Sequence, residues 1–336
     1  MSDERARLHI ISERDVGLFS LIQQVVANIP WAIAEKRIPV VRFGDGTCYW
    51  TPRGYRGRHT VWEYYFEPLE PTYPAARVPD EIKAVISVDP PSPHEIGYSV
   101  GEHAFVSSHF GDHPQLRGAA LPIPFQWDDP SEPLRREAKA VLDNFVRPRA
   151  YILQKANDFF ARHMAGQYVI GVHARGTDAT SQQELRAFRQ GSLVLSRYCA
   201  EIERKLDLQP KAKILVASDE QSSVRHLAAA FPHRVIAYDS VRHESGAAAG
   251  QGPTGWIMPA YIAGSRDVAA KNGEDAVIEY LLLSRCDHLV HNGSSLARTV
   301  LLNAPALPHT NTHRRPPELV TPSGSPEQGR PPGSGS

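Results

Sequence analysis

Three side chains that could bind an anion follow a short apolar segment near the middle of the chain. Residues 168–172 read YVIGV, and His173, Arg175 and Asp178 come soon after them. An apolar run of this length, too short for a helix, is typical of a buried parallel strand. Ligands bind at the carboxyl ends of such strands, where arginine supplies a fixed cation and histidine a titratable donor. The segment predicts either a phosphate-binding loop or an ordinary strand end whose arginine forms a surface ion pair.

Two later segments end in polar residues in the same way. Residues 213–217 are followed by the acidic pair Asp219 and Glu220. Residues 288–291 are followed by two serines, of which Ser295 is placed to cap the next helix. Such a cap directs backbone N–H groups toward whatever lies above the sheet, so a second anion site is expected there.

Parallel strands present their carboxyl ends at one edge of a sheet, so these residues are expected to converge. Glu279, on the helical segment before the last strand, adds a carboxylate. A guanidinium, a helix N-terminus with hydroxyls and several carboxylates suit a nucleoside diphosphate. The chain has no GxGxxG motif at the first turn and no GxxxxGKS/T motif, so sugar nucleotides remain. The converging candidates are His173, Arg175, Asp178, Ser218, Asp219, Glu220, Asn292, Ser294 and Ser295.

The elements around these residues predict a parallel α/β sheet. Strands are expected at 168–172, 213–217 and 234–238, with helices between them near 193–206 and 223–231. A βαβαβ series of this kind builds a Rossmann-like parallel sheet.

The N-terminal part has the same alternation of helix and strand. Apolar residues recur at helical spacing over 18–29, where Ser12 or Asp15 is expected to cap the helix and Pro30 to end it. A strand is expected at 38–43, followed by a glycine-rich turn. Helix, strand and loop in this order fit an α/β layer.

The domain boundary is expected near residues 147–149, where a proline separates two helical patterns. An N-terminal α/β lobe would then cover residues 1–149, and a Rossmann-like lobe residues 150–312. Residues 313–336 are rich in Pro, Gly and Ser and are expected to be disordered.

Three other segments bear on the site. The aromatic run 61–67 predicts a local core or, alternatively, a sugar-stacking wall. The stretch 90–130 holds several histidines but no HxH or HExxH spacing, so no metal site is expected. Residues 246–271 lack periodicity and predict a mobile loop beside the site, before a helix at 275–284.

The composition argues against several classes of protein. Lys+Arg and Asp+Glu both total 37, so the net charge is zero and nucleic-acid binding is not expected. The 3 cysteines are far apart and lack a CxxC spacing, which indicates neither a disulfide framework nor a zinc site. There is no apolar leader and no apolar run long enough for a bilayer, so we expect a cytoplasmic protein without a transmembrane segment.

Three motifs, taken in order, make the chain similar to a known family. VIGVHARGTD, ILVASDE and EYLLLSRCDHLVHNGSSLARTVLLN resemble the motifs of the GDP-fucose-dependent fucosyltransferases, which include α1,6-, nodulation and protein O-fucosyltransferases. The N-terminal GLFSLIQQVV, the strand at residue 38 and VWEYYFEP resemble bacterial members of this superfamily. The resemblance spans most of residues 15–305.

The resemblance implies a two-lobed GT-B fold, with the donor on the C-terminal lobe and the acceptor entering from the N-terminal lobe. It implies an inverting, metal-independent transfer of fucose from GDP-fucose to a glycan hydroxyl, without a cofactor. The partners would be a nucleotide-sugar donor and a glycan acceptor.

The resemblance also implies a role for each residue of this chain that matches a position of the family motifs. Arg175 corresponds to the arginine that holds the β-phosphate and offsets charge on the leaving GDP. His173 corresponds to a donor-contacting histidine, and Asp178 to the acid that orders the loop. Glu279 falls where the family reads guanine, since a carboxylate accepts two parallel donors. The remaining matches are the acidic pair Asp219 and Glu220 and the phosphate-binding serines Ser294 and Ser295.

The chain departs from the α1,6-enzymes just after the first strand. They carry a second arginine and a lysine where this chain has Gly176 and Ala179, which weakens phosphate neutralisation. Their acid for acceptor deprotonation aligns near Gln183, so Glu184 is the candidate base, with a solvated helix carboxylate as the alternative reading. Three other functions stay open: another nucleotide sugar on the same fold, a catalytically silent nucleotide-sugar or glycan-binding module, and a metal-dependent hydrolase using the His-rich stretch.

Overall fold

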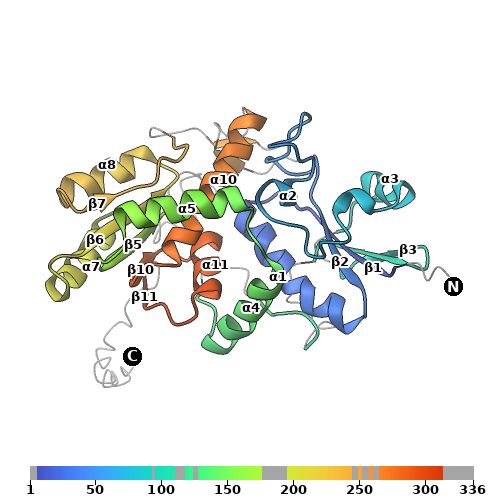
Figure 1. The fold of residues 1–336 in the computed structure, drawn as a ribbon, viewed down its shortest axis with the longest axis horizontal. Coiled ribbons are helices and arrows are strands. Elements are labelled where there is room, and N and C mark those ends of the chain that lie inside the picture. Colours follow the sequence, from blue (N-terminus) through green and yellow to red (C-terminus); the bar gives the residue numbers. More distant parts are fainter. Residues whose placement is uncertain are drawn as a thin grey trace, which may run out of the picture.

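In the computed structural model, the described residues are 6–92, 95–109, 118–123, 128–175, 195–243, 249–251, 257–259 and 265–312. They form two larger sheets, with helices around and between them (Figure 1). The N-terminal sheet and the C-terminal sheet lie at opposite ends of the molecule in this view. The α/β fold class predicted from the sequence is confirmed.

The N-terminal sheet has the strand order β2-β1-β4-β3. The neighbours of β1 are parallel to it, and β3 is antiparallel to β4. Its strands are β1 (Leu8–Ser12), β2 (Ile38–Arg42), β3 (Tyr98–Val100) and β4 (Ala104–Ser107). The helices of this part are α1 (Leu18–Ala34), α2 (Val61–Tyr65), α3 (Asp80–Val88) and the 3-10 helix η1 (Ala75–Arg77).

The C-terminal sheet is parallel throughout, with the order β11-β10-β5-β6-β7. Its strands are β5 (Val169–Ala174), β6 (Lys213–Ser218), β7 (Val235–Ile236), β10 (His288–His291) and β11 (His309–Asn311). The remaining helices, in chain order, are α4 (Glu132–Phe145), α5 (Ala150–His163), α7 (Leu195–Leu208), α8 (Gln221–Ala230), α10 (Arg266–Leu283) and α11 (Ser295–Asn303), of which α4 precedes the expected boundary. Strands β8 (Ala249–Gln251) and β9 (Ile257–Pro259) pair antiparallel in a separate two-stranded sheet. The predicted βαβαβ series is present, although β7 is shorter than expected.

The two sheets fall on either side of the expected boundary, with a break between α4 and α5 at residues 146–149. The division into lobes at residue 149 stays a prediction, because one apolar core runs across it. The expected disordered tail, 313–336, lies outside the described residues.

Helix α1 differs from the prediction at both ends. It begins after Gly17, while Ser12 ends β1, and Pro30 lies inside the helix instead of ending it. Proline removes one helical hydrogen bond, but Trp31 and Ala32 beyond it are 7% and 0% exposed. Burial of Trp31 and Ala32 therefore outweighs the local cost of proline.

Helix α10 was also predicted too short. It starts at Arg266, capped by Ser265, so the end of the expected mobile loop is helical. The helix packs against α2, α5 and α11 and is buried on several sides. The first two turns of α10 are partly exposed, while the helix from Gly273 onward is buried on nearly all sides, so no single amphipathic stripe runs along it to mark its start. Of the helices described, none is long and apolar enough to cross a membrane.

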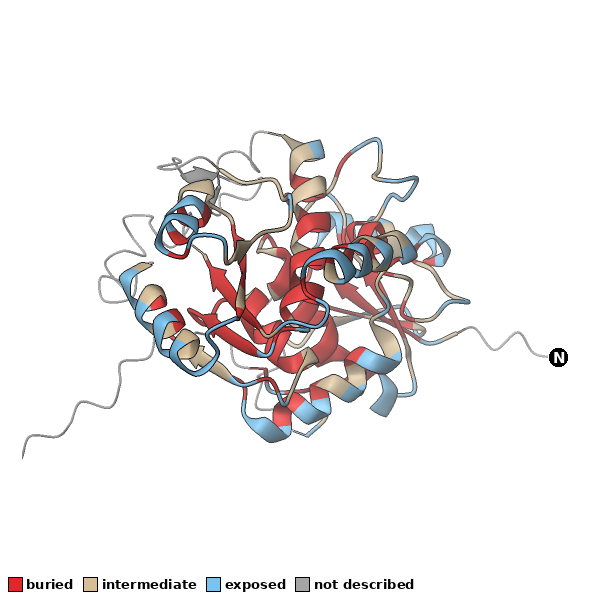
Figure 2. Ribbon diagram, turned by 60° about the vertical axis from the view of Figure 1, so that its left-hand side comes forward, coloured by how far each residue is buried: buried red, intermediate tan, exposed pale blue. Residues whose placement is uncertain are grey.

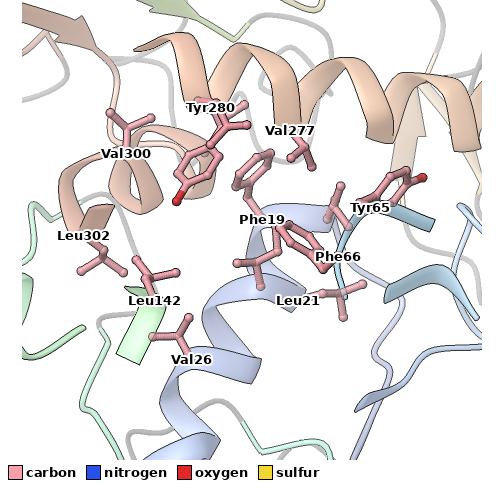
Figure 3. Close-up of a cluster of buried hydrophobic side chains, with 14 of the residues drawn as sticks. Phe19, Leu21, Val26, Tyr65, Phe66, Leu142, Val277, Tyr280, Val300 and Leu302 are labelled. Carbon is pink, nitrogen blue, oxygen red and sulfur yellow. The ribbon is translucent and has the colours of Figure 1, made fainter. Parts of the chain in front are cut away.

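The largest core cluster joins the two halves of the chain. Figure 2 shows buried segments concentrated in the middle of the molecule, and Figure 3 shows Phe19 of α1 near Tyr280 of α10. Their ring centroids are 5.4 Å apart. Trp62, Tyr64, Tyr65 and Phe66 are each at most 1% exposed, which confirms the core interpretation of the aromatic run.

Gly273 on α10 gives a test of this packing. A Cβ there would lie 2.3 Å from Tyr65 Oη and 2.6 Å from its Cζ. Tyr65 is fully buried and donates to the Ala270 carbonyl at 2.8 Å, so the ring has little room to move. We expect G273A to lower the free energy of unfolding by about 1–3 kcal/mol, measured by urea denaturation.

Gly17 is the matched control for this substitution. Its φ is −59°, and a Cβ there would meet nothing within 4 Å. Gly17 is the N-cap of α1, where alanine is less favourable than glycine, but alanine also restricts the unfolded chain by a similar free energy, so G17A should change stability by only a few tenths of a kcal/mol. Equal losses in the two variants would contradict the packing described for α2 and α10.

Candidate functional site

The candidate site lies where β10, β5 and β6 end side by side at one edge of the C-terminal sheet (Figure 1). In the register of these strands, His173 pairs with His291 on one side and with Ala217 on the other. The segments that follow the strands carry the residues expected to converge. The structure brings together His173, Arg175, Asp219, Glu220, Asn292, Ser294 and Ser295.

The end of β5 is tied to the start of α11 through a histidine and a serine. His173 is 6% exposed, and its Nδ1 lies 3.0 Å from Ser294 Oγ. Ser294 Oγ also accepts the backbone N–H of Ala297 at 3.2 Å. The prediction that Ser295 caps this helix is wrong by one residue, because Ser294 has the extended backbone of a cap and Ser295 is already helical.

A second hydrogen bond ties the same two segments. Asn292 Nδ2 donates to the carbonyl oxygen of Arg175 at 3.2 Å, and Asn292 is 3% exposed. Arg175 is half-buried. Its charge helps to lower the pKa of both His173 and Arg298, so its guanidinium is near both. Asn292 therefore fixes the backbone that carries the candidate phosphate-binding arginine.

Arg298 is a cation that sequence analysis missed. It lies in the first turn of α11, is 3% exposed and donates through Nη2 to Ser295 Oγ at 3.2 Å. Burial and then the charge of Arg175 lower its pKa to about 10, against the effect of Asp128 and Asp129. The available signal was an arginine within an otherwise apolar helix. Two guanidinium groups near one helix N-terminus create a site with positive potential.

The acidic pair after β6 is half-buried at the neighbouring strand end. Glu220 is the N-cap residue of α8, and its Oε2 accepts from Ser223 Oγ at 3.3 Å. Burial, together with the charge of Asp219, raises the pKa of Glu220. The backbone N–H of His243 donates to the Asp219 carbonyl at 2.9 Å, which fixes this loop against the segment after β7.

Glu279 is engaged in a buried ion pair. Its Oε1 accepts from Arg242 Nη2 at 3.0 Å and from Ser240 Oγ at 2.6 Å. Burial raises its pKa to about 7, against the opposing charge of Arg242. Oε1 accepts both of these hydrogen bonds. Guanine recognition by Glu279 stays a prediction. A guanine base would have to donate to Oε2 or displace Arg242 from Oε1.

Arg242 organises this corner of the site, and sequence analysis missed it as well. Its guanidinium donates to the carbonyl oxygens of Ser218 at 3.1 Å, Tyr238 at 2.7 Å and Ser240 at 3.4 Å. These carbonyls belong to the end of β6 and to the segment after β7. Arg242 therefore holds the acidic loop in place through backbone contacts, which no sequence spacing reveals.

Two of the predicted site residues, Asp178 and Glu184, lie outside the described residues. The same holds for the departures from the family pattern at Gly176, Ala179 and Gln183. Their proposed roles in ordering the loop and in deprotonating the acceptor stay predictions.

Helix α1 connects the N-terminal part of the chain to the site. Gln23 Nε2 donates to the Ser295 carbonyl at 2.8 Å and to Thr299 Oγ1 at 3.1 Å. Gln24 and Asn28, farther along α1, hold the ends of β1 and β4 through the carbonyls of Ser12 and His109. One helix therefore fixes the strand ends of the first sheet relative to the N-terminus of α11.

Among the described residues, one group has the spacing of metal ligands: Asp129, His291 and His309. The Gly293 N–H donates to His291 Nδ1 at 2.9 Å, so the neutral ring carries its proton on Nε2, 3.7 Å from Asp129 Oδ1. Arg135 Nη2 lies 3.1 Å from His309 Nε2. A histidine that binds a metal does so through one unprotonated ring nitrogen and donates the N–H of the other nitrogen. Here the Nε2 of His291 that faces Asp129 carries a proton, and the Nε2 of His309 faces the guanidinium of Arg135. The group therefore does not fit a metal ion.

Several buried histidines make stability depend on pH. Burial lowers the pKa to about 4 for His9 and His288 and to about 3 for His291, and also lowers the pKa of His173. In the unfolded chain they titrate near 6.5 and bind protons that the native state does not. These groups therefore cost stability as pH falls from about 6.5 toward 4.

Acidic groups with raised pKa values have the opposite effect, because the stability that they contribute is lost as pH rises. The pKa of Glu279 is about 7 and those of Glu220 and Asp275 are raised, so the native state binds their protons more tightly. Since four histidines outweigh three acids, we expect stability to increase from pH 4 to 6.5. Unfolding near pH 5.5 should take up about one to three protons. Urea denaturation across this range measures the slope, and a flat or falling profile would contradict the assigned burial.

Comparisons with known proteins bear on the fold. No protein-family model and no curated protein matches the chain. Solved structures do match. The chain is similar to NodZ alpha-1,6-fucosyltransferase soaked with GDP-fucose, at 18% identity and a TM-score of 0.55, covering 90% of this chain and 94% of that chain. A second match is the selenomethionine form of fucosyltransferase NodZ from Bradyrhizobium, at 18% identity and a TM-score of 0.55, covering 90% and 93%.

A third similar structure is POFUT1 in complex with GDP. The identity is 13%, the TM-score 0.50, and the coverage 91% of this chain and 98% of that chain. At such identities these likenesses establish the fold. The GT-B-like fold of the GDP-fucose fucosyltransferases, expected from three motifs, is confirmed.

Proposed function

We propose that the protein is an inverting glycosyltransferase that moves fucose from GDP-fucose to a glycan hydroxyl without a metal ion. One observation carries this proposal: Arg175, His173 and the N-terminus of α11 meet at the carboxyl edge of the C-terminal sheet. Similar structures of the same fold have been solved with GDP or GDP-fucose. The proposal therefore joins a suitable anion site to a fold known to hold this nucleotide.

In the proposed reaction, the acceptor oxygen attacks the anomeric carbon while the bond from that carbon to the β-phosphate oxygen breaks. The acceptor proton passes to a carboxylate, for which Glu184 is the candidate. Negative charge builds on the departing diphosphate. Arg175 and the N–H groups at the start of α11 are placed to offset that charge, and such preorganised donors act mainly on the transition state.

The remaining polar groups would bind the nucleoside. Asp219 and Glu220 offer carboxylates to ribose hydroxyls, and Glu279 offers Oε2 to guanine donors. Ser295 keeps a hydroxyl proton for phosphate, since its oxygen accepts from Arg298. The acceptor would enter from the N-terminal part, which Gln23 fixes against α11.

Release of GDP from GDP-fucose, measured with a panel of glycan acceptors, tests this function. We expect acceptor-dependent release that persists in excess chelator. Loss of activity in chelator would support a metal-dependent enzyme instead.

A catalytically silent nucleotide-sugar or glycan-binding module is the second candidate. It is favoured by Gly176 and Ala179, which replace two cations of the α1,6-enzymes. Tight GDP binding without turnover on any acceptor would support the silent module and contradict the transferase.

A further inference from the structure

The turn between β10 and α11 uses two neighbouring imidazoles as hydrogen-bond acceptors. The Gly293 N–H donates to His291 Nδ1 at 2.9 Å, and Ser294 Oγ lies 3.0 Å from His173 Nδ1. Gly293 has a φ of 76°, which glycine adopts without the strain of a side chain. This conformation directs one backbone donor and one hydroxyl at two ring nitrogens.

The hydroxyl of Ser294 has one proton to donate and two acceptor sites. It already accepts from the Ala297 N–H at 3.2 Å, and Ser294 is 3% exposed. Among the described residues, His173 Nδ1 is the other group within hydrogen-bond distance of this hydroxyl. A buried hydroxyl proton needs an acceptor, so Ser294 donates to Nδ1 and the ring carries its own proton on Nε2.

His173 is held as a neutral donor by its surroundings. Burial keeps its pKa well below the usual range, Asp219 opposes this effect and Arg175 adds to it. The Tyr198 hydroxyl donates to the His173 carbonyl at 3.1 Å and fixes the backbone beneath the ring. Near neutral pH, the ring therefore has one N–H that is not used by Ser294.

We propose that Ser294 is a positioning residue that holds His173 in the Nε2–H tautomer, so that the ring donates a hydrogen bond to an oxygen of the bound nucleotide. The identity of the ligand rests on the proposed function, while the tautomer depends on no ligand. The inference also separates the roles of the two serines. The hydroxyl of Ser294 is used by the helix cap and by His173. Ser295 and the backbone N–H groups at the start of α11 therefore remain to contact the phosphate directly.

Three variants of Ser294 separate the tautomer from the helix cap. S294T keeps both the cap and a hydroxyl donor. S294G costs only a few tenths of a kcal/mol as a cap but has no hydroxyl. S294D keeps the cap, but its ionised carboxylate accepts hydrogen bonds and donates none.

Nitrogen-15 NMR of the ring reports the tautomer, and calorimetric titration with GDP reports binding. His9, whose ring bonds to Asn28 Oδ1 in the other half of the chain, is the internal control and should not change. The wild type and S294T should show His173 with its proton on Nε2. S294D should move the proton to Nδ1, and S294G should give a mixture of tautomers.

We expect GDP to bind more tightly to variants in which His173 carries its proton on Nε2. We expect S294T to bind within about twofold of the wild type and S294G to bind about tenfold more weakly, the scale of one hydrogen bond. A wild-type His173 with its proton on Nδ1, or equal GDP affinity in S294T and S294G, would overturn the proposal. If the wild type binds no GDP, the proposed function fails, and the NMR measurement still decides the role of Ser294.

Discussion

Replacing Arg175 with alanine is expected to lower the turnover of the proposed fucosyl transfer at least a hundredfold. Removal of one preorganised donor to a developing oxyanion costs about 10²–10³ in rate. Arg175 stands at the end of β5, with its carbonyl fixed by Asn292 and its charge beside His173. The loss should fall on kcat, because the contact strengthens as charge builds on the leaving diphosphate.

Two further variants sharpen this measurement. R175K keeps a positive charge but loses the planar fork that binds phosphate through two donors, so it should recover only part of the rate. R162A is the matched control, since Arg162 lies on α5 and donates to the Asp158 carbonyl on the same exposed helix face. It should leave turnover unchanged. An R175A variant within tenfold of the wild type would contradict the assignment of the phosphate site.

The largest effect on stability is expected at a buried carboxylate that joins the two halves of the chain. Glu274 on α10 has a fully buried side chain and receives Tyr55 Oη at 2.7 Å, Arg56 Nε at 2.7 Å and the ammonium of Lys155. Burial alone would raise its pKa, but these hydrogen bonds outweigh burial and lower it. The carboxylate is therefore charged and depends on its partners.

Removal of both cations should cost more than removal of the acid. The double variant R56M/K155M leaves a buried, charged Glu274, and we expect it to lose about 3–5 kcal/mol of unfolding free energy. In E274Q, the side chains of Arg56 and Lys155 are 43% and 36% exposed and can return to water. E274Q should lose only about 1–3 kcal/mol. Urea denaturation measures both.

The control for this comparison is an exposed ion pair that also links the segment around residues 53–56 to helix α10. Arg53 and Asp267 form an ion pair of 2.8 Å with side chains 84% and 62% exposed. R53A should change stability by at most about 0.5 kcal/mol, because exposed pairs are weak. If E274Q proved costlier than R56M/K155M, the buried charge would not be the source of the effect.

The parts of the site that are local in sequence could be predicted. Each of β5, β6 and β10 is a short apolar run that ends in polar residues, and parallel strands bring those ends together. His173, Arg175 and Ser294 were found in this way. The error of one residue at the cap arose because either serine of the pair has the chemistry of a cap, and only the backbone conformation distinguishes them.

The parts that depend on tertiary contacts could not be predicted. Arg242 acts through carbonyls of the Ser218 and Tyr238 segments, and Glu274 meets Arg56 from a loop 218 positions earlier. Neither contact has a period or a spacing in the sequence. The burial of Arg298 also depends on tertiary contacts. Helix α10 has no single apolar stripe, because its first two turns are partly exposed and the rest of it is buried.

The most direct test of the central claim is a crystal structure of the wild-type protein soaked with GDP. The account predicts density for the diphosphate at the N-terminus of α11, with Arg175 and Ser295 within hydrogen-bond distance of its oxygens and His173 Nε2 facing the nucleotide. Guanine should lie toward Glu279. A diphosphate bound elsewhere, or a fully occupied nucleotide that does not touch Arg175, would contradict the account.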